Sequence, residues 1–295
     1  MKKQTQGSIL LLIATFIWGT AFVAQSVGMD HIEPFTFQAV RSLIAVAALL
    51  PVIFIMERGK KRVVGFWKSW ADPALWKTGI PCGVALFVAS GLQQMGLVYT
   101  DSGKAGFITA MYIVLVPVIG LFLGQKCGFN VWISVVLAVL GLYLLSALGV
   151  QSVNIGDLLL MGCAFAFAVQ ITLIDRLGLS LDGLRLNLAQ FFVNAVLSTV
   201  VMFLFETPVL ENIAACAGPL LYTGVLSSGV AYSLQILGQQ RLDPAPASLI
   251  MSLESVFAVL AGWLILGDKL SAVELAGCAL VFAGVILSQW EPKKQ

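Results

Sequence analysis

Charged residues are scarce in this chain. Aspartate, glutamate, lysine and arginine together make up 11% of its 295 residues, whereas 59% of the residues are hydrophobic. A water-soluble domain has about a quarter of its residues charged, so this deficit indicates that lipid surrounds most of the chain. No segment as long as a soluble domain separates the apolar runs, so we expect any function to reside within a helix bundle or at its mouths.

The motifs of common enzymes and metal sites are missing as well. No GxxxxGK[ST] loop is present, so we expect no ATP hydrolysis by this chain to power its function. The single histidine, His31, has no metal-ligand spacing around it, and no acidic cluster resembles the magnesium site of a prenyl-transferring membrane enzyme. The cysteines stand singly, without metal or redox spacing: Cys82, Cys127, Cys163, Cys216 and Cys278. We therefore expect no enzyme, no metal, no cofactor and no nucleic-acid partner.

Long apolar runs fill most of the remaining sequence. Each run has about 18 to 22 residues, which is enough for a helix to cross a hydrocarbon core of roughly 30 Å. Runs of this length without strand-like alternation form helices and not a barrel. The sequence predicts an all-α polytopic membrane protein with ten transmembrane helices, over residues 9–27, 35–55, 79–98, 105–123, 131–149, 157–174, 186–205, 219–237, 247–266 and 273–290.

Basic residues are unevenly divided between the two sides of these helices. With the N-terminus placed in the cytoplasm, fourteen lysines and arginines fall on the cytoplasmic side and only Lys104 and Lys269 on the outer side. The positive-inside rule then predicts a multi-pass protein of the cytoplasmic (inner) membrane with both termini in the cytoplasm. The basic stretch at residues 58–62 is either a topology anchor or a contact for anionic membrane lipid.

One long segment occurs twice in the chain. Residues 96–126 read GLVYTDSGKAGFITAMYIVLVPVIGLFLGQK, and residues 238–269 read GQQRLDPAPASLIMSLESVFAVLAGWLILGDK. Each copy holds an aspartate in a short loop, Asp101 in the first and Asp243 in the second. An internal repeat in a polytopic membrane chain is typical of a transporter core.

The repeat extends over both halves of the chain. Residues 7–16 also match residues 156–165, so we expect two five-helix repeats, at residues 7–149 and 155–290. Because five is odd, the second repeat enters the membrane in the opposite orientation to the first. The two repeats are then related by a pseudo-twofold axis in the membrane plane, as in inverted-repeat transporters.

Two ionisable residues lie inside predicted spans, where a charge is costly and often functional. Arg41 lies about two turns into the second span, and Glu254 about two turns into the ninth, each roughly 10 Å deep at 1.5 Å per residue. Glu254 is a candidate for proton coupling or for binding a substrate amine; the alternative is a structural carboxyl between helices. Arg41 is a candidate substrate contact, or it extends to the interface or ties helix ends together.

Several uncharged polar and aromatic residues are further candidates for contacts with a small-molecule substrate. Gln93 and Gln235 occupy matched positions in the two repeats, where each amide either joins helices or contacts substrate. Tryptophan usually lies at the membrane interface, so the mid-span Trp18 is a candidate for lining a cavity. Other polar candidates, each of which could instead be structural, are Tyr112, Gln170 and Tyr232.

In motif order and spacing, the chain resembles the drug/metabolite transporter superfamily, in the branch built from two EamA-type domains. The motifs that carry the resemblance are IWGTAF at 17–22, EP at 33–34 with RSL at 41–43, GLVYT at 96–100 with GKAG at 103–106, and LESVF at 253–257. Two departures are Ser255, where the family has a proline, and Gln125, where it often has an acid. The resemblance implies a ten-helix inverted-repeat fold in which spans 1, 3, 4, 6, 8 and 9 surround a central cavity.

The resemblance also implies a secondary transporter of small metabolites or amino acids. We expect alternating access, with export as the direction and proton coupling as a hypothesis; the alternative is a passive facilitator of small solutes. Asp101 at the outer mouth and Asp243 at the inner mouth are candidate gate-loop residues. The sequence is compatible with a monomer or a homodimer.

Overall fold

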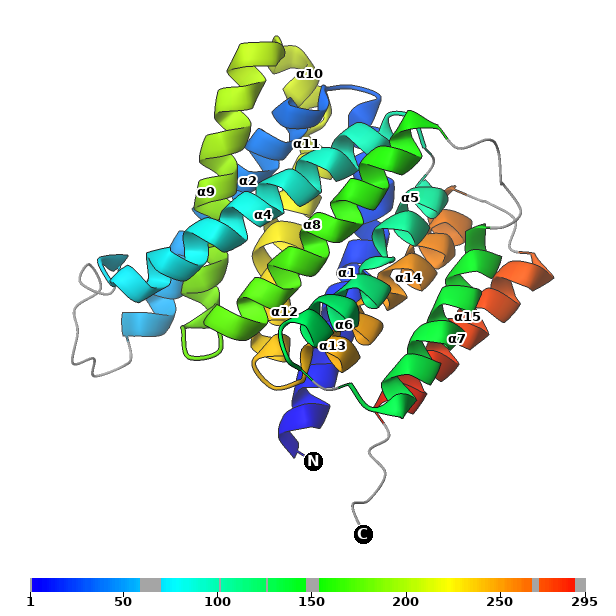
Figure 1. Cartoon of the computed structure of the whole chain (residues 1–295). Helices are drawn as coiled ribbons and strands as arrows, with labels where there is room; N and C mark the ends of the chain where they lie inside the picture. Colours follow the sequence, from blue (N-terminus) through cyan, green and yellow to red (C-terminus); the bar gives the residue numbers. More distant parts are fainter. Residues whose placement is uncertain are drawn as a thin grey trace.

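The computed structural model describes residues 2–58, 70–100, 102–125, 127–146, 154–266 and 271–289. Throughout these ranges the chain forms helices and no strand, which confirms the predicted all-α class (Figure 1). Asp101, one of the two candidate gate-loop residues, lies outside the described residues.

The helices follow one another along the chain with short connections. The first half contains α1 (Lys2–Met29), α2 (Pro34–Arg58), α4 (Pro73–Leu97), α5 (Ser102–Thr109), α6 (Tyr112–Phe122) and α7 (Phe129–Ser146). The second half contains α8 (Ile155–Leu177), α9 (Gly183–Phe205), α10 (Leu210–Ala215), α11 (Ala217–Leu221), η2 (Tyr222–Ala231), α12 (Tyr232–Gln239), α13 (Pro244–Met251), α14 (Leu253–Ala261), η3 (Gly262–Leu266) and α15 (Ala272–Ser288).

The length and composition of these helices suit a membrane. In the described ranges, eight helical segments are long and apolar enough to cross a bilayer, and two shorter apolar helices cover Phe129–Leu145 and Ala272–Ser288. Each of the ten predicted runs overlaps one of these segments. The chain is therefore an all-helical, multi-pass membrane protein.

The helices pack into one bundle around α1. This helix contacts η2 and α12 on one side and α13 and α14 on another, while α4 packs against both α8 and α9. Helices α7 and α15 form a pair at one edge of the bundle (Figure 1). Ser8 near the start of α1 donates a hydrogen bond to Gln289 just after α15, so both helices have these ends at one face, called the N-terminal end below. The opposite face is called the far end.

Two of the spans are broken near their middle. The fourth expected span is divided into α5 and α6, with Ala110 and Met111 between them, and the ninth into α13 and α14, with Ser252 between them. At the breaks, backbone hydrogen bonds join residues three apart instead of four apart. Met111 N donates to Ile108 O, and Ser255 N donates to Ser252 O. Such tightening inside a helix often marks a hinge or a functional site.

Candidate functional site

Side chains from nine helical segments converge on a cavity inside the bundle. Its volume of about 40 Å³ holds a few water molecules and is far below the roughly 300 to 1,000 Å³ of pockets that take drug-sized ligands. The lining residues are Trp18, Phe22, Gln25, Arg41, Gln93, Tyr112, Phe167, Ile171, Ser227, Tyr232, Gln235, Met251 and Glu254. Seven of the eight substrate or coupling candidates from the sequence thus lie around this one cavity.

Glu254 and Tyr112 meet inside this cavity. Glu254 lies in the first turn of α14, directly after the break in its span, and Tyr112 is the first residue of α6, directly after the other break. The Tyr112 hydroxyl donates a hydrogen bond of 2.9 Å to Oε1 of Glu254. Glu254 is buried, with a relative exposure of only 6%. The two broken helices are therefore linked at their breaks by the acid and the phenol.

Arg41 of α2 reaches the same cavity from another side. Arg41 is 5% exposed, and its Nη1 donates a hydrogen bond of 2.7 Å to Oε1 of Gln25 on α1. The guanidinium carbon lies 5.8 Å from the centre of the Phe37 ring. Within the described residues, Arg41 Nε has no hydrogen-bond partner and no ion pair joins Arg41 to Glu254. The guanidinium thus keeps donor capacity for another group.

An aromatic cluster forms one wall of the cavity. The ring centroids of Trp18 and Tyr232 lie 4.9 Å apart at 65°, and those of Tyr232 and Phe191 lie 5.1 Å apart at 80°. Edge-to-face packing of this kind fixes the orientation of the three rings. The buried Nε1 of Trp18 has no hydrogen-bond partner among the described residues.

The matched glutamines both reach the cavity, whereas Gln170 lies behind it. Gln235 lines the cavity and donates to Gln170 (3.3 Å), which donates to Gln190 (3.0 Å). Gln190 in turn donates to Asn187. The side-chain amide nitrogen of Asn187 donates to the Ser228 and Gly229 carbonyls of the π-helix η2. Gln170 is therefore part of a buried amide network between α8, α9 and η2.

The sequence reasoning missed several lining residues. Gln25 is the most informative of these, because Trp18, Phe22 and Gln25 follow one another at i, i+4 and i+7 on a single face of α1. A polar residue at helical spacing from the mid-span tryptophan was a usable signal. Phe22, Phe167, Ile171 and Met251 carried none, since apolar residues fill every span.

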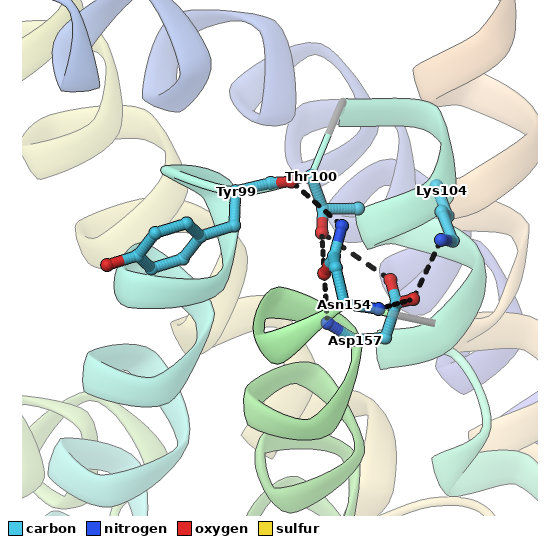
Figure 2. Close-up of polar contacts among 5 residues, drawn as sticks. All are labelled: Tyr99, Thr100, Lys104, Asn154 and Asp157. Atoms are coloured by element: carbon cyan, nitrogen blue, oxygen red, sulfur yellow. Dashed lines mark hydrogen bonds and ion pairs between the residues drawn. The ribbon is translucent and has the colours of Figure 1, made fainter. Parts of the chain in front are cut away.

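A polar cluster joins α4, α5 and α8 at the far end (Figure 2). Lys104 Nζ lies 2.8 Å from Oδ2 of Asp157 in an ion pair. Asp157 and Asn154 form a capping box at the start of α8, with two bonds of 3.0 Å between the backbone N–H of each and the side chain of the other. Asn154 also donates to the Tyr99 carbonyl at 3.0 Å, and Thr100 donates to Asn154 at 3.3 Å. These bonds hold the three helices together at the far end.

Asp243 lines a separate cleft of about 390 Å³ at the N-terminal end, and not the central cavity. Gln125 and Asp175 share this cleft and are joined by a 3.1 Å hydrogen bond from the amide to the carboxylate. Cys127 lies there too, outside the spans. Partial burial raises the pKa of its thiol, and the negative charge of Asp243 raises that pKa further.

Comparison with known proteins places this architecture among transporters. The model of the EamA-like transporter family matches the chain twice, over residues 5–147 and 154–290. An uncharacterized transporter of Archaeoglobus fulgidus is 32% identical over 286 residues, which cover 97% of this chain and 86% of that protein. The uncharacterized transporter YoaV of Bacillus subtilis is 23% identical, with 94% of each chain covered.

The similarity extends to a plant protein and to a solved structure. A chloroplastic WAT1-related protein of Arabidopsis thaliana is 24% identical over 94% of this chain and 68% of that protein. A crystal structure with 19% sequence identity superposes with a TM-score of 0.78, covering 97% of this chain and 96% of the other. At that identity the superposition supports the fold alone.

Proposed function

This chain belongs to the EamA-like transporter family, and we propose that it is a secondary transporter that moves a small metabolite by alternating access through its central cavity. The observation that carries the proposal is the bond between Tyr112 and Glu254. It places an intramembrane acid at the meeting point of two broken helices. Transporter sites commonly lie near the midplane where discontinuous helices meet.

We further propose the predicted architecture of ten membrane helices in two inverted repeats, at residues 7–149 and 155–290. Support comes from two close helix contacts between residues that occupy matching positions in the two repeats. Gly7 matches Gly156 in sequence, and Gly96 matches Gly238. A Cβ on Gly7 would lie 3.1 Å from the Gly238 carbonyl oxygen, and one on Gly156 would lie 2.9 Å from that of Gly96. Each repeat thus presses its first helix against the third helix of the other.

The helix contacts elsewhere are consistent with the same exchange. If α1 corresponds to α8, and α5 with α6 to α13 with α14, then the contact of α1 with α14 corresponds to that of α8 with α6. The pairs α2 with α9 and α7 with α15 each join corresponding helices. The family model also matches each half separately.

The orientation we propose follows the positive-inside rule. The N-terminal end then faces the cytoplasm, and the far end faces outward, in a cytoplasmic (inner) membrane. Asp243 lies in the cleft at the proposed cytoplasmic mouth, and the ion pair of Lys104 with Asp157 lies at the proposed outer mouth. We assign the opening and closing of access to these two places.

Glu254 is the proposed coupling group. A carboxyl in the membrane interior is a typical element of proton relays. The titratable or charged groups nearest to it are Tyr112 on α6, Tyr232 on α12, Arg41 on α2 and Cys163 on α8. Proton binding at Glu254 removes its negative charge and so weakens its interaction with any cationic group of a substrate. This exchange would couple export of the solute to proton entry.

Flux in proteoliposomes tests the proposal. Vesicles with the purified protein are loaded with a metabolite extract, and efflux of each solute is followed by mass spectrometry with and without an inward proton gradient. The expected result is gradient-stimulated efflux of a small set of solutes, lost in Glu254→Gln and retained in Glu211→Gln, whose carboxyl is exposed on α10. Efflux equal with and without the gradient would favour a passive facilitator. No efflux above empty vesicles would refute a transporter.

A further inference from the structure

The eighth membrane span contains a long π-helix. Its ten residues, η2 (Tyr222–Ala231), continue directly into the α-helix α12. A π-helix is rare, usually occupies a single turn inside an α-helix, and is frequently found at a functional site. Ser227 of η2 lines the central cavity, so the irregular segment borders the candidate site.

Three side chains at steps of five residues along this span face α1 or the cavity. Tyr222 shares a hydrogen bond with the Thr20 hydroxyl of α1. Ser227 lines the cavity, and the Tyr232 ring packs on Trp18 of α1. Backbone hydrogen bonds of a π-helix join residues five apart, so side chains five apart lie on one face. In an α-helix, at about 100° per residue, they would point about 140° apart. The five-residue bonding pattern, called the π register below, therefore brings the three side chains together.

The return to an α-helix leaves one backbone carbonyl without a backbone partner. The Tyr232 N–H donates to the Ser227 carbonyl, five residues back. In the α-helical pattern of α12, the next N–H, that of Ser233, pairs with the carbonyl four residues back, at Gly229. This change of pattern skips the Ser228 carbonyl. An unpaired carbonyl inside a membrane protein is costly, so the π register requires another donor for Ser228.

Asn187 of α9 supplies that donor. Its Nδ2 lies 3.1 Å from the Ser228 carbonyl oxygen and 3.1 Å from the Gly229 carbonyl oxygen. The same nitrogen donates to Oγ of Ser233 at 2.9 Å. Its Oδ1 accepts a 2.9 Å bond from Gln190, which fixes the orientation of the amide. The buried side chain of Asn187 thus satisfies the junction between η2 and α12 from a neighbouring helix.

We infer that Asn187 is a positioning residue for transport, whose amide keeps span 8 in the π register and thereby turns Ser227 toward the cavity. Asn187 does not line the cavity itself, so it acts through η2. Its role in transport rests on the function proposed above, whereas its control of the register is a property of the fold.

Loss of this amide favours rewinding of η2 into an α-helix. The Ser228 carbonyl then pairs with the Tyr232 N–H, four residues ahead, and no longer needs Asn187. Rewinding turns Ser227 away from the face that holds Tyr232. It also brings Val225, seven residues before Tyr232, to within about 20° of that face.

The first arm of the test measures the register of the wild-type protein. Ser227→Cys and Val225→Cys are made separately in a protein without other cysteines, and a membrane-impermeant maleimide is added on both faces of proteoliposomes. Ser227 lines the cavity, whereas Val225 does not. A thiol must be accessible to water to react, so we expect Ser227→Cys to be labelled about tenfold or more faster than Val225→Cys.

The second arm removes the donor with Asn187→Leu and Asn187→Ala. Loss of one hydrogen bond to a buried carbonyl shifts an equilibrium by about tenfold, so the ratio of the two labelling rates should fall by about that factor. Flux of the solutes identified from the metabolite extract should fall with it. Asn187→Ala introduces less bulk, and it decides the question if Asn187→Leu does not fold.

Asn194→Leu is the matched control. Asn194 is another fully buried asparagine of α9, and its Oδ1 accepts hydrogen bonds from Gln38 and Ser198. Among the described residues it makes no hydrogen bond to η2. Its replacement should therefore lower the unfolding temperature and leave the labelling ratio at the wild-type value.

Several results overturn the inference. Equal labelling of the two cysteine variants in the wild-type background would remove the π register. An unchanged ratio in the Asn187 variants, or the same change in Asn194→Leu, would leave Asn187 a merely structural residue. A changed ratio with undiminished flux would separate the register from transport. A wild-type protein that moves no solute would instead refute the proposed function, and the labelling ratio would still decide whether Asn187 sets the register.

Discussion

The hydroxyl of Tyr112 donates a 2.9 Å hydrogen bond to Oε1 of Glu254, across 142 residues of sequence. Both residues lie in the first turn after a break in a membrane helix, so this bond links the two halves of the chain where each is irregular. A movement of either helix at its break must change the surroundings of the acid. The candidate site and the two helix breaks therefore lie in the same part of the molecule.

Tyr112→Phe removes this bond and keeps the ring. A buried hydrogen bond to a charged group contributes about 1.5 to 3 kcal/mol, so we expect a lower unfolding temperature in detergent and altered flux. Tyr99→Phe is the matched control, because the exposed Tyr99 ring lies outside the cavity. If Tyr112→Phe and Tyr99→Phe behave alike in both assays, the bond between the broken helices has no role.

The exchanged glycine contacts predict paired effects on stability. In Gly96→Ala the new Cβ would lie 2.7 Å from Cγ of Leu160, and in Gly238→Ala it would lie 2.7 Å from Cγ of Leu11. Overpacking of this kind costs about 1 to 3 kcal/mol, so both variants should unfold at lower temperature. Gly218→Ala is the control, since no atom lies within 4 Å of its new Cβ. Destabilisation in only one of the two matched positions would count against equivalent packing in the repeats.

The reactivity of Cys127 should depend on pH and on Asp243. Burial and then the Asp243 charge raise the pKa of this thiol, so less of the reactive thiolate is present at neutral pH, and labelling should accelerate as pH rises. Asp243→Asn removes the negative charge, lowers the thiol pKa and should shift the labelling curve to lower pH. The measurement is maleimide labelling of a protein in which Cys127 is the only cysteine.

Glu211→Gln in the same single-cysteine protein is the control for this measurement. Its carboxyl is exposed on α10, and Asp243 is the charged group that acts on Cys127, so Glu211→Gln should leave the labelling curve unchanged. An equal shift in both variants would contradict a specific effect of the Asp243 charge.

The positions of the helices were largely predictable from the sequence, but the breaks were not. Ten apolar runs predict the spans, because the bilayer determines the length and composition of a helix that crosses it. The residues at the breaks, Ala110, Met111 and Ser252, include neither proline nor glycine, so nothing local marks them. The breaks depend on contacts between helices, such as the bond from Ser255 Oγ to the Gly106 carbonyl.

The candidate site was predictable to a similar degree. Arg41 and Glu254 stood out because charges are rare in membrane helices. Tyr112 was a candidate as well, but its pairing with Glu254 depends on packing between segments 142 residues apart. Gln25, the partner of Arg41, was missed although it lies only 16 residues before it. Asp157 was missed because a carboxyl at the start of a helix is expected to cap that helix, and Asp157 does so together with Asn154. Its other partner, Lys104, lies 53 residues away in the sequence.

Labelling of the cavity from each side of the membrane distinguishes alternating access from an open channel. Ser227 lines the cavity, so Ser227→Cys in a protein without other cysteines reports access by a membrane-impermeant maleimide from either face of oriented vesicles. Lys104→Gln removes the far-end ion pair with Asp157. For Lys104→Gln we expect severalfold faster labelling from the outer face and slower labelling from the cytoplasmic face, whereas Lys104→Arg, which keeps a cation opposite Asp157, should label like the parent. Labelling that rises from both faces together, as in an open channel, or that changes from neither face, would contradict alternating access.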